Sequence, residues 1–245
     1  MDKRFAILGD IHSNSDALRA VVEDARSQSV TDFLCVGDVV GYNADPVACI
    51  TIVRDELSAV TVRGNHDHYC AFRDEQLDDF QPLAASVIAW TRRQLSDVDA
   101  AWLRALPLQK LVMGIGLVHS TLDMPDRWGY VFDLLDAEAH FTYQPTTLSF
   151  NGHTHVPVVF AKQGNDVMRF EPSAFQAGIG TKYFINVGSV GQPRDGDTRS
   201  SYVTFCSKTR KIEFRRVAYD VDAAMDRNIR ANIPQRFVNR LALGR

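Results

Sequence analysis

Short apolar runs, separated by polar or glycine-containing segments, set the pattern of the first half of the chain. They fall at residues 5–8, 33–36, 59–62 and 115–118. Their length and β-branched content indicate buried strands. After the first run, apolar residues recur at helical spacing up to about Ser27, and Ser13 or Asn14 can cap that helix.

The remaining elements follow from the same signals. Helical patterns cover about residues 46–57, 83–95 and 98–106, and they resume near Val221 and Pro234. Strands dominate after residue 148, at residues 148–151, 156–162, 167–170, 183–187, 201–205 and 211–217. Elements that are mixed first and strand-rich later suggest two packed sheets with helices outside.

Polar residues that can bind metals follow the predicted strands. Asp10 and His12 follow the first run, Asp38 the second, Asn65 the third and His119 the fourth. In open α/β sheets, ligands gather at the carboxyl ends of the strands, so these residues should converge on one crevice.

A fifth block, Gly152-His153-Thr154-His155, is the most specific, because alternating histidines on a short extended segment have few structural uses. Each other block alone is an ordinary turn sequence, so the combination decides the interpretation. Carboxylates, imidazoles and one carboxamide without thiolates favour Mn, Fe or Zn at a functional site, with enough ligands for two ions.

The five blocks resemble those of the calcineurin-like metallophosphoesterase family, in the family's order. The segment 186–197, rich in glycine, is similar to a loop of its small prokaryotic phosphodiesterase-type members. The resemblance implies an α/β fold, a four-layer α/β/β/α sandwich of two mixed sheets flanked by helices. We expect residues 1–245 to form a single calcineurin-like phosphoesterase domain.

The resemblance also implies a ligand set for two divalent or trivalent transition-metal ions, Mn, Fe or Zn. One ion would take Asp10, His12, Asp38 and His155, and the other Asp38, Asn65, His119 and His153. A bridging carboxylate can hold two cations about 3.5–4 Å apart, and a water between them becomes hydroxide near neutral pH. That hydroxide would attack the phosphorus of a small phosphodiester or phosphomonoester substrate.

Three further residues are candidates near the metals. His66 has no metal in this assignment and is the candidate proton donor, and Asp67 would orient His66 or a metal-bound histidine. Arg194, in the glycine-rich loop, could fork onto phosphate oxygens. Its alternative is an ion pair with Asp195 or Asp197 on an exposed turn, and the resemblance favours phosphate.

Two histidines and one segment stay outside this assignment. We expect His68 to be a solvated loop residue and His140 to lie at the surface or partly buried. The sequence departs from the family at Ser120, where glycine is common. Residues 120–143 should cover the substrate, with aromatic residues that stack on a base or aryl group or, more commonly, pack in the core.

Composition limits the binding partners and the cellular compartment that we expect. The 245 residues carry 27 Lys and Arg against 30 Asp and Glu, a net charge of -3, so general attraction to nucleic acid is unexpected. The four Cys have no C-x-x-C spacing and are interpreted as reduced thiols. No signal-like or membrane-length apolar stretch occurs, which predicts a cytoplasmic protein without a membrane partner; no particular oligomeric state is indicated.

Two alternatives to a small-molecule phosphoesterase stay open. The same fold can serve as a non-catalytic protein-interaction module, but such relatives have lost ligands, and the full set with His66 favours an enzyme. A protein phosphatase is less favoured, because the chain lacks obvious extensions for docking a large partner.

Overall fold

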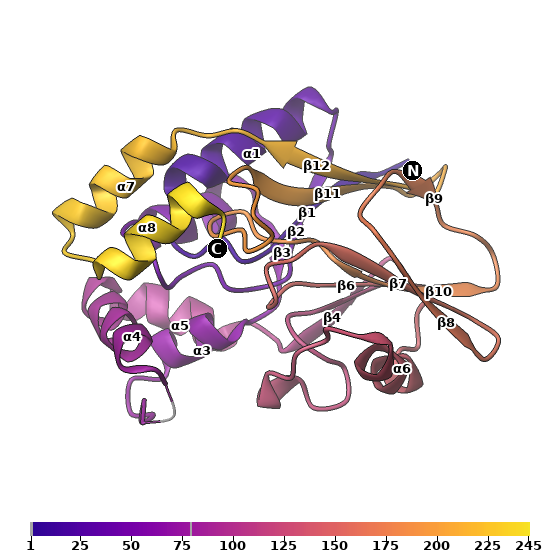
Figure 1. The fold of residues 1–245 in the computed structure, drawn as a ribbon, viewed down its shortest axis with the longest axis horizontal. Helices are drawn as coiled ribbons and strands as arrows, with labels where there is room; N and C mark the ends of the chain where they lie inside the picture. The colour runs from indigo at the N-terminus through magenta and orange to yellow at the C-terminus, as the bar shows by residue number, and fades with distance from the viewer. Residues whose placement is uncertain (1, 79) are drawn as a thin grey trace.

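Two six-stranded mixed sheets form the centre of the molecule (Figure 1). The computed structural model describes residues 2–78 and 80–245. The first sheet has the order β3 (Val60–Thr61), β2 (Asp32–Cys35), β1 (Arg4–Leu8), β11 (Ser200–Cys206), β12 (Lys211–Val217) and β9 (Phe175–Gln176). The second has the order β4 (Gln109–Val112), β5 (Ile115–Val118), β6 (Leu148–Asn151), β10 (Thr181–Asn186), β7 (Val158–Gln163) and β8 (Asp166–Phe170).

Eight α-helices surround the sheets in the described part of the chain. They are α1 (Ser15–Ser27), α2 (Pro46–Thr51), α3 (Asn65–Ala71), α4 (Pro82–Gln94), α5 (Asp97–Ala105), α6 (Leu134–Tyr143), α7 (Val221–Arg230) and α8 (Gln235–Leu243). A π-helical turn, Ile52–Glu56, extends α2, so the predicted helix over 46–57 is confirmed in two pieces.

Alternating side chains on the strands explain the layers. In β1, Phe5 and Ile7 face the core between the two sheets, whereas Ala6 and Leu8 face the core under α1. On the other side, Phe141 of α6 packs in a third apolar cluster with strands of the second sheet. With α1 outside one sheet and α6 outside the other, the predicted α/β/β/α sandwich is confirmed (Figure 1).

The strands that precede the candidate ligands run in one direction. The pairs β1–β2, β2–β3, β5–β6 and β6–β10 are parallel, and the other pairs are antiparallel. The carboxyl ends of the parallel strands therefore meet at one end of each sheet, where the ligand-bearing loops begin.

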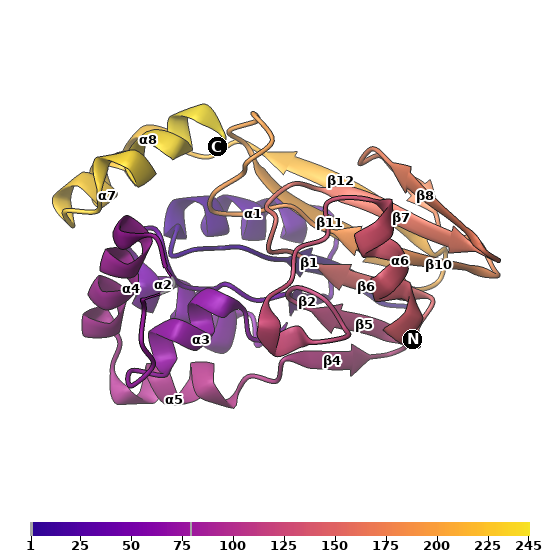
Figure 2. The same cartoon turned by 60° about the horizontal axis from the view of Figure 1, so that its bottom comes forward.

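The C-terminal helices return to that same end. In both views α7 and α8 lie beyond the sheets, on the side of α3, α4 and α5 and away from β8 (Figures 1 and 2). Val87 of α4 and Phe237 of α8 share an apolar cluster with Ile233, and Tyr42 packs against it. Residues near the C-terminus thus reach the loop that follows β2.

Three elements escaped the sequence prediction: α3, and the short strands β4 and β9. The predicted cover at 120–143 divides, because its second half is α6, which packs on the second sheet. No helix in residues 2–78 and 80–245 is long and apolar enough to cross a membrane. All four cysteines are free thiols.

Candidate metal centre

The predicted metal ligands converge from five strand ends. Asp10 follows β1, Asp38 follows β2, Asn65 opens α3 just after β3, His119 follows β5, and His153 follows β6. The predicted ligands His12 and His155 lie with them, and six of the seven are buried, with Asn65 half-buried. The expected convergence at the carboxyl ends is confirmed as geometry.

The histidines form two close pairs of ring nitrogens. His12 Nε2 lies 3.0 Å from His155 Nε2, and His119 Nε2 lies 3.1 Å from His153 Nδ1. Asp38 Oδ2 lies between the pairs, 3.5 Å from His12 Nε2 and 3.3 Å from His119 Nε2. One carboxylate oxygen is therefore within reach of both clusters.

In the first pair, the Nδ1 atom of each ring already forms a hydrogen bond to a backbone carbonyl. Nδ1 of His12 lies 3.1 Å from the Val40 carbonyl, and Nδ1 of His155 lies 2.6 Å from the Gln192 carbonyl. A carbonyl only accepts, so each Nδ1 carries the proton and donates it. Burial lowers the pKa of both rings well below the ordinary value, so each Nε2 presents a lone pair. Two lone pairs 3.0 Å apart repel unless a cation lies between them.

In the second pair, too, the nitrogens that face each other need a positive charge between them. His119 donates through Nδ1 to the Val36 carbonyl, and His153 donates through Nε2 to the Trp128 carbonyl. Burial lowers the pKa of His119, but the carboxylate of Asp38 outweighs it and raises the pKa to about 9. This cluster holds a proton where a metal ion would sit, and the donor set therefore fits a divalent ion in each cluster.

The pKa values of Asp10 and Asp38 are shifted in opposite directions. Burial raises the pKa of Asp10 to about 7, whereas His119 and His66 outweigh burial at Asp38 and hold its pKa well below the usual range. Both oxygens of Asp10 accept the backbone N–H of His153, at 3.1 and 3.0 Å. The centre is thus built around one firmly ionised carboxylate, Asp38.

Five of the seven predicted ligands have a left-handed backbone, which non-glycine residues rarely adopt. They are Asp10, His12, Asp38, His153 and His155, with φ between 47° and 71°. Each such residue costs on the order of 1–3 kcal/mol, and this strain collects at functional sites because the surroundings enforce it. Here the enforcement includes hydrogen bonds from the Asp10 and His12 N–H to the Gly37 and Asp38 carbonyls.

Glycine at two positions makes room for the carboxylates. A Cβ at Gly152 would lie 2.2 Å from Asp10 Oδ2, and one at Gly64 would lie 2.1 Å from Asp38 Oδ1. The chain therefore needs glycine in these motifs so that backbone can approach the ligands.

Asp67 supports the backbone rather than a ring. Its carboxylate accepts the N–H groups of Asp38 at 2.8 Å, Gly64 at 3.1 Å and Val40 at 3.1 Å. The predicted contact with His66 or a metal-bound histidine is therefore replaced by a brace across the two ligand loops. Asp67 lies one turn into α3, an element that the sequence prediction lacked.

Comparison with known proteins agrees with this geometry. The model of the calcineurin-like phosphoesterase superfamily domain matches residues 4–210. The chain belongs to the calcineurin-like phosphoesterase superfamily. Membership indicates metal-dependent phosphoester hydrolysis as the general activity, and the buried Asp and His clusters are the candidate metal ligands.

Similar proteins align with nearly the whole of this chain. An uncharacterised protein of Methanocaldococcus jannaschii is 37% identical over 245 residues, which cover 98% of each chain. The crystal structure of a metallophosphoesterase from Sphaerobacter thermophilus superposes with a TM-score of 0.87 at 32% identity, covering 100% of both chains. A protein of Pyrococcus horikoshii, PH1004, shares the fold with a TM-score of 0.78 at 17% identity, over 99% of this chain and 98% of its own.

His66 lies beside the candidate metal ligands and lines the same cavity as Asp38 and His155. Its ring centroid is 4.8 Å from that of His12 and 4.4 Å from that of Tyr42, and its backbone N–H donates to Asp38 Oδ1 at 2.8 Å. Burial lowers its pKa to about 4, and its Nδ1 has no hydrogen-bond partner in the described residues. The ring is thus neutral at pH 7 and retains one N–H.

Arg194 lines the same cavity, which has a volume of about 280 Å³. The carboxylates that sequence reasoning offered as its partners are engaged elsewhere: Asp195 pairs with Arg216, and Asp197 with Arg199 at 2.7 Å. Among the described residues no ion pair involves Arg194, whose Nη2 donates only to the neutral Gln192 Oε1 at 3.2 Å, so its guanidinium has no carboxylate partner.

The first half of the predicted cover does reach the site. The Tyr130 ring stacks on His153 at 4.0 Å between centroids, and Phe132 stacks on Tyr130 at 5.3 Å. Tyr130 is 48% exposed, so part of its side chain is accessible beside the cavity. Ser120 is buried, and its hydroxyl donates to the Pro125 carbonyl at 3.4 Å.

Two predictions for other histidines were wrong. His68 belongs to α3 rather than a loop, and its Nε2 lies 2.8 Å from Glu75 Oε1. His140 is 1% exposed rather than at the surface, with its ring 3.6 Å from that of Phe184. Both predictions treated histidine as a polar residue. In the folded chain its ring packs readily against aromatic residues.

Sequence reasoning also missed Tyr42. Its ring lies 4.6 Å from His12 and covers the outer side of the site. The available signal was its place four residues after Asp38, on the same loop.

Proposed function

We propose that this protein is a binuclear-metal-dependent phosphoesterase that hydrolyses a small phosphodiester or phosphomonoester. The observation that carries the proposal is the position of Asp38 Oδ2 between two pairs of imidazole nitrogens. The two nitrogens within a pair are 3.0 Å apart in one pair and 3.1 Å apart in the other. This arrangement supports one shared carboxylate and two ions, as the sequence predicts.

The residues that would hold the ions are those of the two clusters. Asp10, His12 and His155 would serve one ion, Asn65, His119 and His153 the other, and Asp38 both. In support, the donor atoms of Asp10, His12 and His155 lie within 4.8 Å of one another, and so do those of Asp38, His119 and His153. When bound, two such ions supply Lewis-acid activation of water and of the phosphoryl group. Mn, Fe and Zn all suit this donor set.

His66 is the proposed donor to the leaving group. Because burial lowers its pKa to about 4, we assign to the N–H of the neutral imidazole a hydrogen bond to the leaving oxygen, rather than transfer of a proton from imidazolium. A hydrogen bond to the departing oxygen strengthens as negative charge develops there.

The remaining residues position the substrate and exclude water. Arg194 would bind a non-bridging phosphate oxygen, since a guanidinium without an internal counterion favours an anion. The rings of Tyr42 and Tyr130 cover His12 and His153, which limits water around the ligand nitrogens.

Turnover of p-nitrophenyl phosphate and of bis(p-nitrophenyl) phosphate tests the proposal. We expect hydrolysis that chelation abolishes and that Mn, Fe or Zn restores. Arg194→Ala should lower kcat/KM more for the dianionic monoester than for the monoanionic diester, with metal content unchanged. A protein that binds both ions and hydrolyses neither ester would instead be a binding module.

A further inference from the structure

The metal-centre cavity continues into a second one. The outer cavity, about 560 Å³, is lined by Tyr42, Gln81, Pro82, Leu83, Ala84, Arg236, Phe237 and Arg240. It shares Tyr42, Gln81 and Ala84 with the cavity that contains His66 and Arg194, so the two adjoin. A ligand held at the metal centre can therefore extend outward between α4 and α8.

One wall of the outer cavity is built by α8. Arg236, Phe237 and Arg240 belong to this helix, which follows the residues 4–210 that match the superfamily model. Phe237 anchors α8 by packing with Val87 of α4. The outer cavity thus depends on the C-terminal helix as well as on the part of the chain that carries the candidate metal ligands.

The outer cavity is positively charged, and none of the described residues that line it is a counterion. Within the described part of the chain, no carboxylate lines it, and no acid lies within ion-pair distance of Arg236 or Arg240. Arg227, on the preceding helix, is instead paired with Asp16 at 2.9 Å. Burial, followed by the charges of Arg194 and Arg236, lowers the pKa of Arg240.

Aromatic rings lie between these cations. Tyr42 and Phe237 have ring centroids 5.1 Å apart. The Arg194 guanidinium lies 5.5 Å from the centre of the Tyr42 ring, and that of Arg240 lies 5.3 Å from the centre of the Phe237 ring. From the metal centre outward, the surface therefore presents a cation, two rings and further cations.

We propose that the substrate carries a second phosphate, which Arg236 and Arg240 bind while the scissile phosphate lies at the metal centre beside Arg194. Unpaired guanidinium groups repel one another and are suited to forked hydrogen bonds with phosphate oxygens. Tyr42, which is half-buried and packs on the buried Phe237, offers a ring surface to the organic part of the molecule that joins the two phosphates. As a statement about substrate, this inference rests on the proposed function.

Binding can be measured without turnover. Thymidine 3′,5′-bisphosphate and thymidine 5′-phosphate differ by one phosphate. Calorimetry on the 245-residue chain in chelator compares their affinities, with circular dichroism to confirm folding. We expect the bisphosphate to bind at least about tenfold more tightly. Arg236→Gln with Arg240→Gln should remove this preference. Arg230→Gln, on α7 and outside the cavity, should retain it.

Turnover supplies the second readout. The metal-loaded protein is given thymidine 5′-(p-nitrophenyl phosphate) with and without a 3′-phosphate, and release of p-nitrophenolate is followed. The 3′-phosphate should raise kcat/KM at least about tenfold through KM, and only in proteins that retain both arginines. Equal affinities and equal kcat/KM for both members of each pair would overturn the inference while leaving the phosphoesterase intact. A binding preference without hydrolysis of either ester would instead overturn the proposed function and leave the second phosphate site standing.

Discussion

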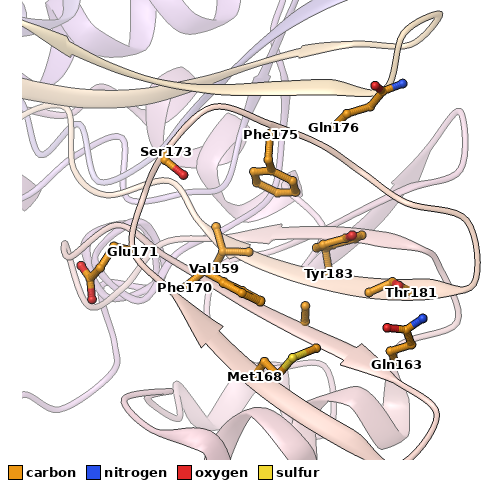
Figure 3. A pocket seen from close by; sticks show the side chains of 11 residues that line it. Val159, Gln163, Met168, Phe170, Glu171, Ser173, Phe175, Gln176, Thr181 and Tyr183 are labelled. Carbon is orange, nitrogen blue, oxygen red and sulfur yellow. The ribbon is translucent and has the colours of Figure 1, made fainter.

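Two cavities lie at opposite ends of β10, and they differ in what builds them. The metal centre adjoins its carboxyl end, where Asn186 donates to the Gly152 carbonyl and Thr154 Oγ1. The far cavity, about 360 Å³, extends from the amino end at Thr181 and Tyr183 along β7 and β8 to Phe175 (Figure 3). Figure 3 shows Phe170, Phe175 and Tyr183 pointing into it.

The far cavity lacks the features that mark the metal centre. None of its lining residues has a left-handed backbone, and none belongs to a cluster of metal-ligating side chains. It is the larger of the two cavities, 360 Å³ against 280 Å³. Backbone strain and closely spaced donor atoms, rather than volume, therefore distinguish the candidate metal centre from the far cavity.

The largest expected effect is that of Asp38→Asn. Because Asp38 Oδ2 adjoins both clusters, the change should weaken both ions together and lower kcat by more than the 10²–10³-fold typical of one electrostatic donor. Metal analysis after dialysis and a kcat measurement check this. Asp166→Asn, at the edge strand beside the far cavity, is the control and should change neither. One ion retained at full occupancy in Asp38→Asn would refute a shared ligand.

His66→Gln should lower kcat by about 10²–10⁴-fold with metal content intact. The loss should shrink for an ester with a more acidic leaving group, which needs less help to depart. His68→Gln, two residues further along α3 and paired with Glu75, serves as the matched control with little change. An equal loss for all leaving groups would exclude the donor role.

Two glycine substitutions, one at the candidate metal centre and one at the far end of the second sheet, should differ in their effect on metal affinity. Gly152→Ala places a Cβ 2.2 Å from Asp10 Oδ2, so we expect metal affinity to fall about 10–100-fold as Asp10 is displaced. Gly164→Ala, in the turn between β7 and β8, meets no atom within 4 Å but has φ of 59°. It should cost about 1 kcal/mol of stability and leave metal affinity unchanged. Similar metal loss in both variants would contradict the steric explanation.

His140 should affect stability but not catalysis. Burial lowers its pKa to about 4, despite the opposing charge of Asp123, whereas an unfolded histidine titrates near pH 6.5. The folded state therefore binds the proton more weakly, and stability that is complete above about pH 6.5 falls as the pH drops towards 4. The loss should approach about 3 kcal/mol.

Urea unfolding at pH 7 and pH 5 in chelator measures this dependence. His140→Gln should flatten it, with kcat at pH 7 unchanged. An unaltered pH dependence in the variant would mean that other groups cause it.

The features that could be predicted from the sequence are those determined by residues close together in the chain. The blocks around Asp10, Asp38 and His153 could be recognised because residue type and spacing carry the chemistry, and the flanking apolar runs revealed the strands. The left-handed backbone of Asp10 and Asp38 could not be predicted, since it depends on hydrogen bonds between loops far apart in the chain.

Other features depend on packing. The seven-residue helix α3 begins at the predicted ligand Asn65 and has little apolar periodicity, so its pattern resembles a loop. Tyr42 meets Phe237 only because α8 folds back onto α4, and no local signal joins residues so distant in sequence. The outer cavity was therefore invisible before the fold was known.

Diffraction from crystals of the metal-loaded protein at the absorption edges of Mn, Fe and Zn tests the central claim most directly. We expect two anomalous peaks, one among Asp10, His12 and His155 and the other among Asn65, His119 and His153. Asp38 should lie between them and contact both. A single ion at full occupancy, or two ions of which only one contacts Asp38, would contradict the shared-carboxylate centre.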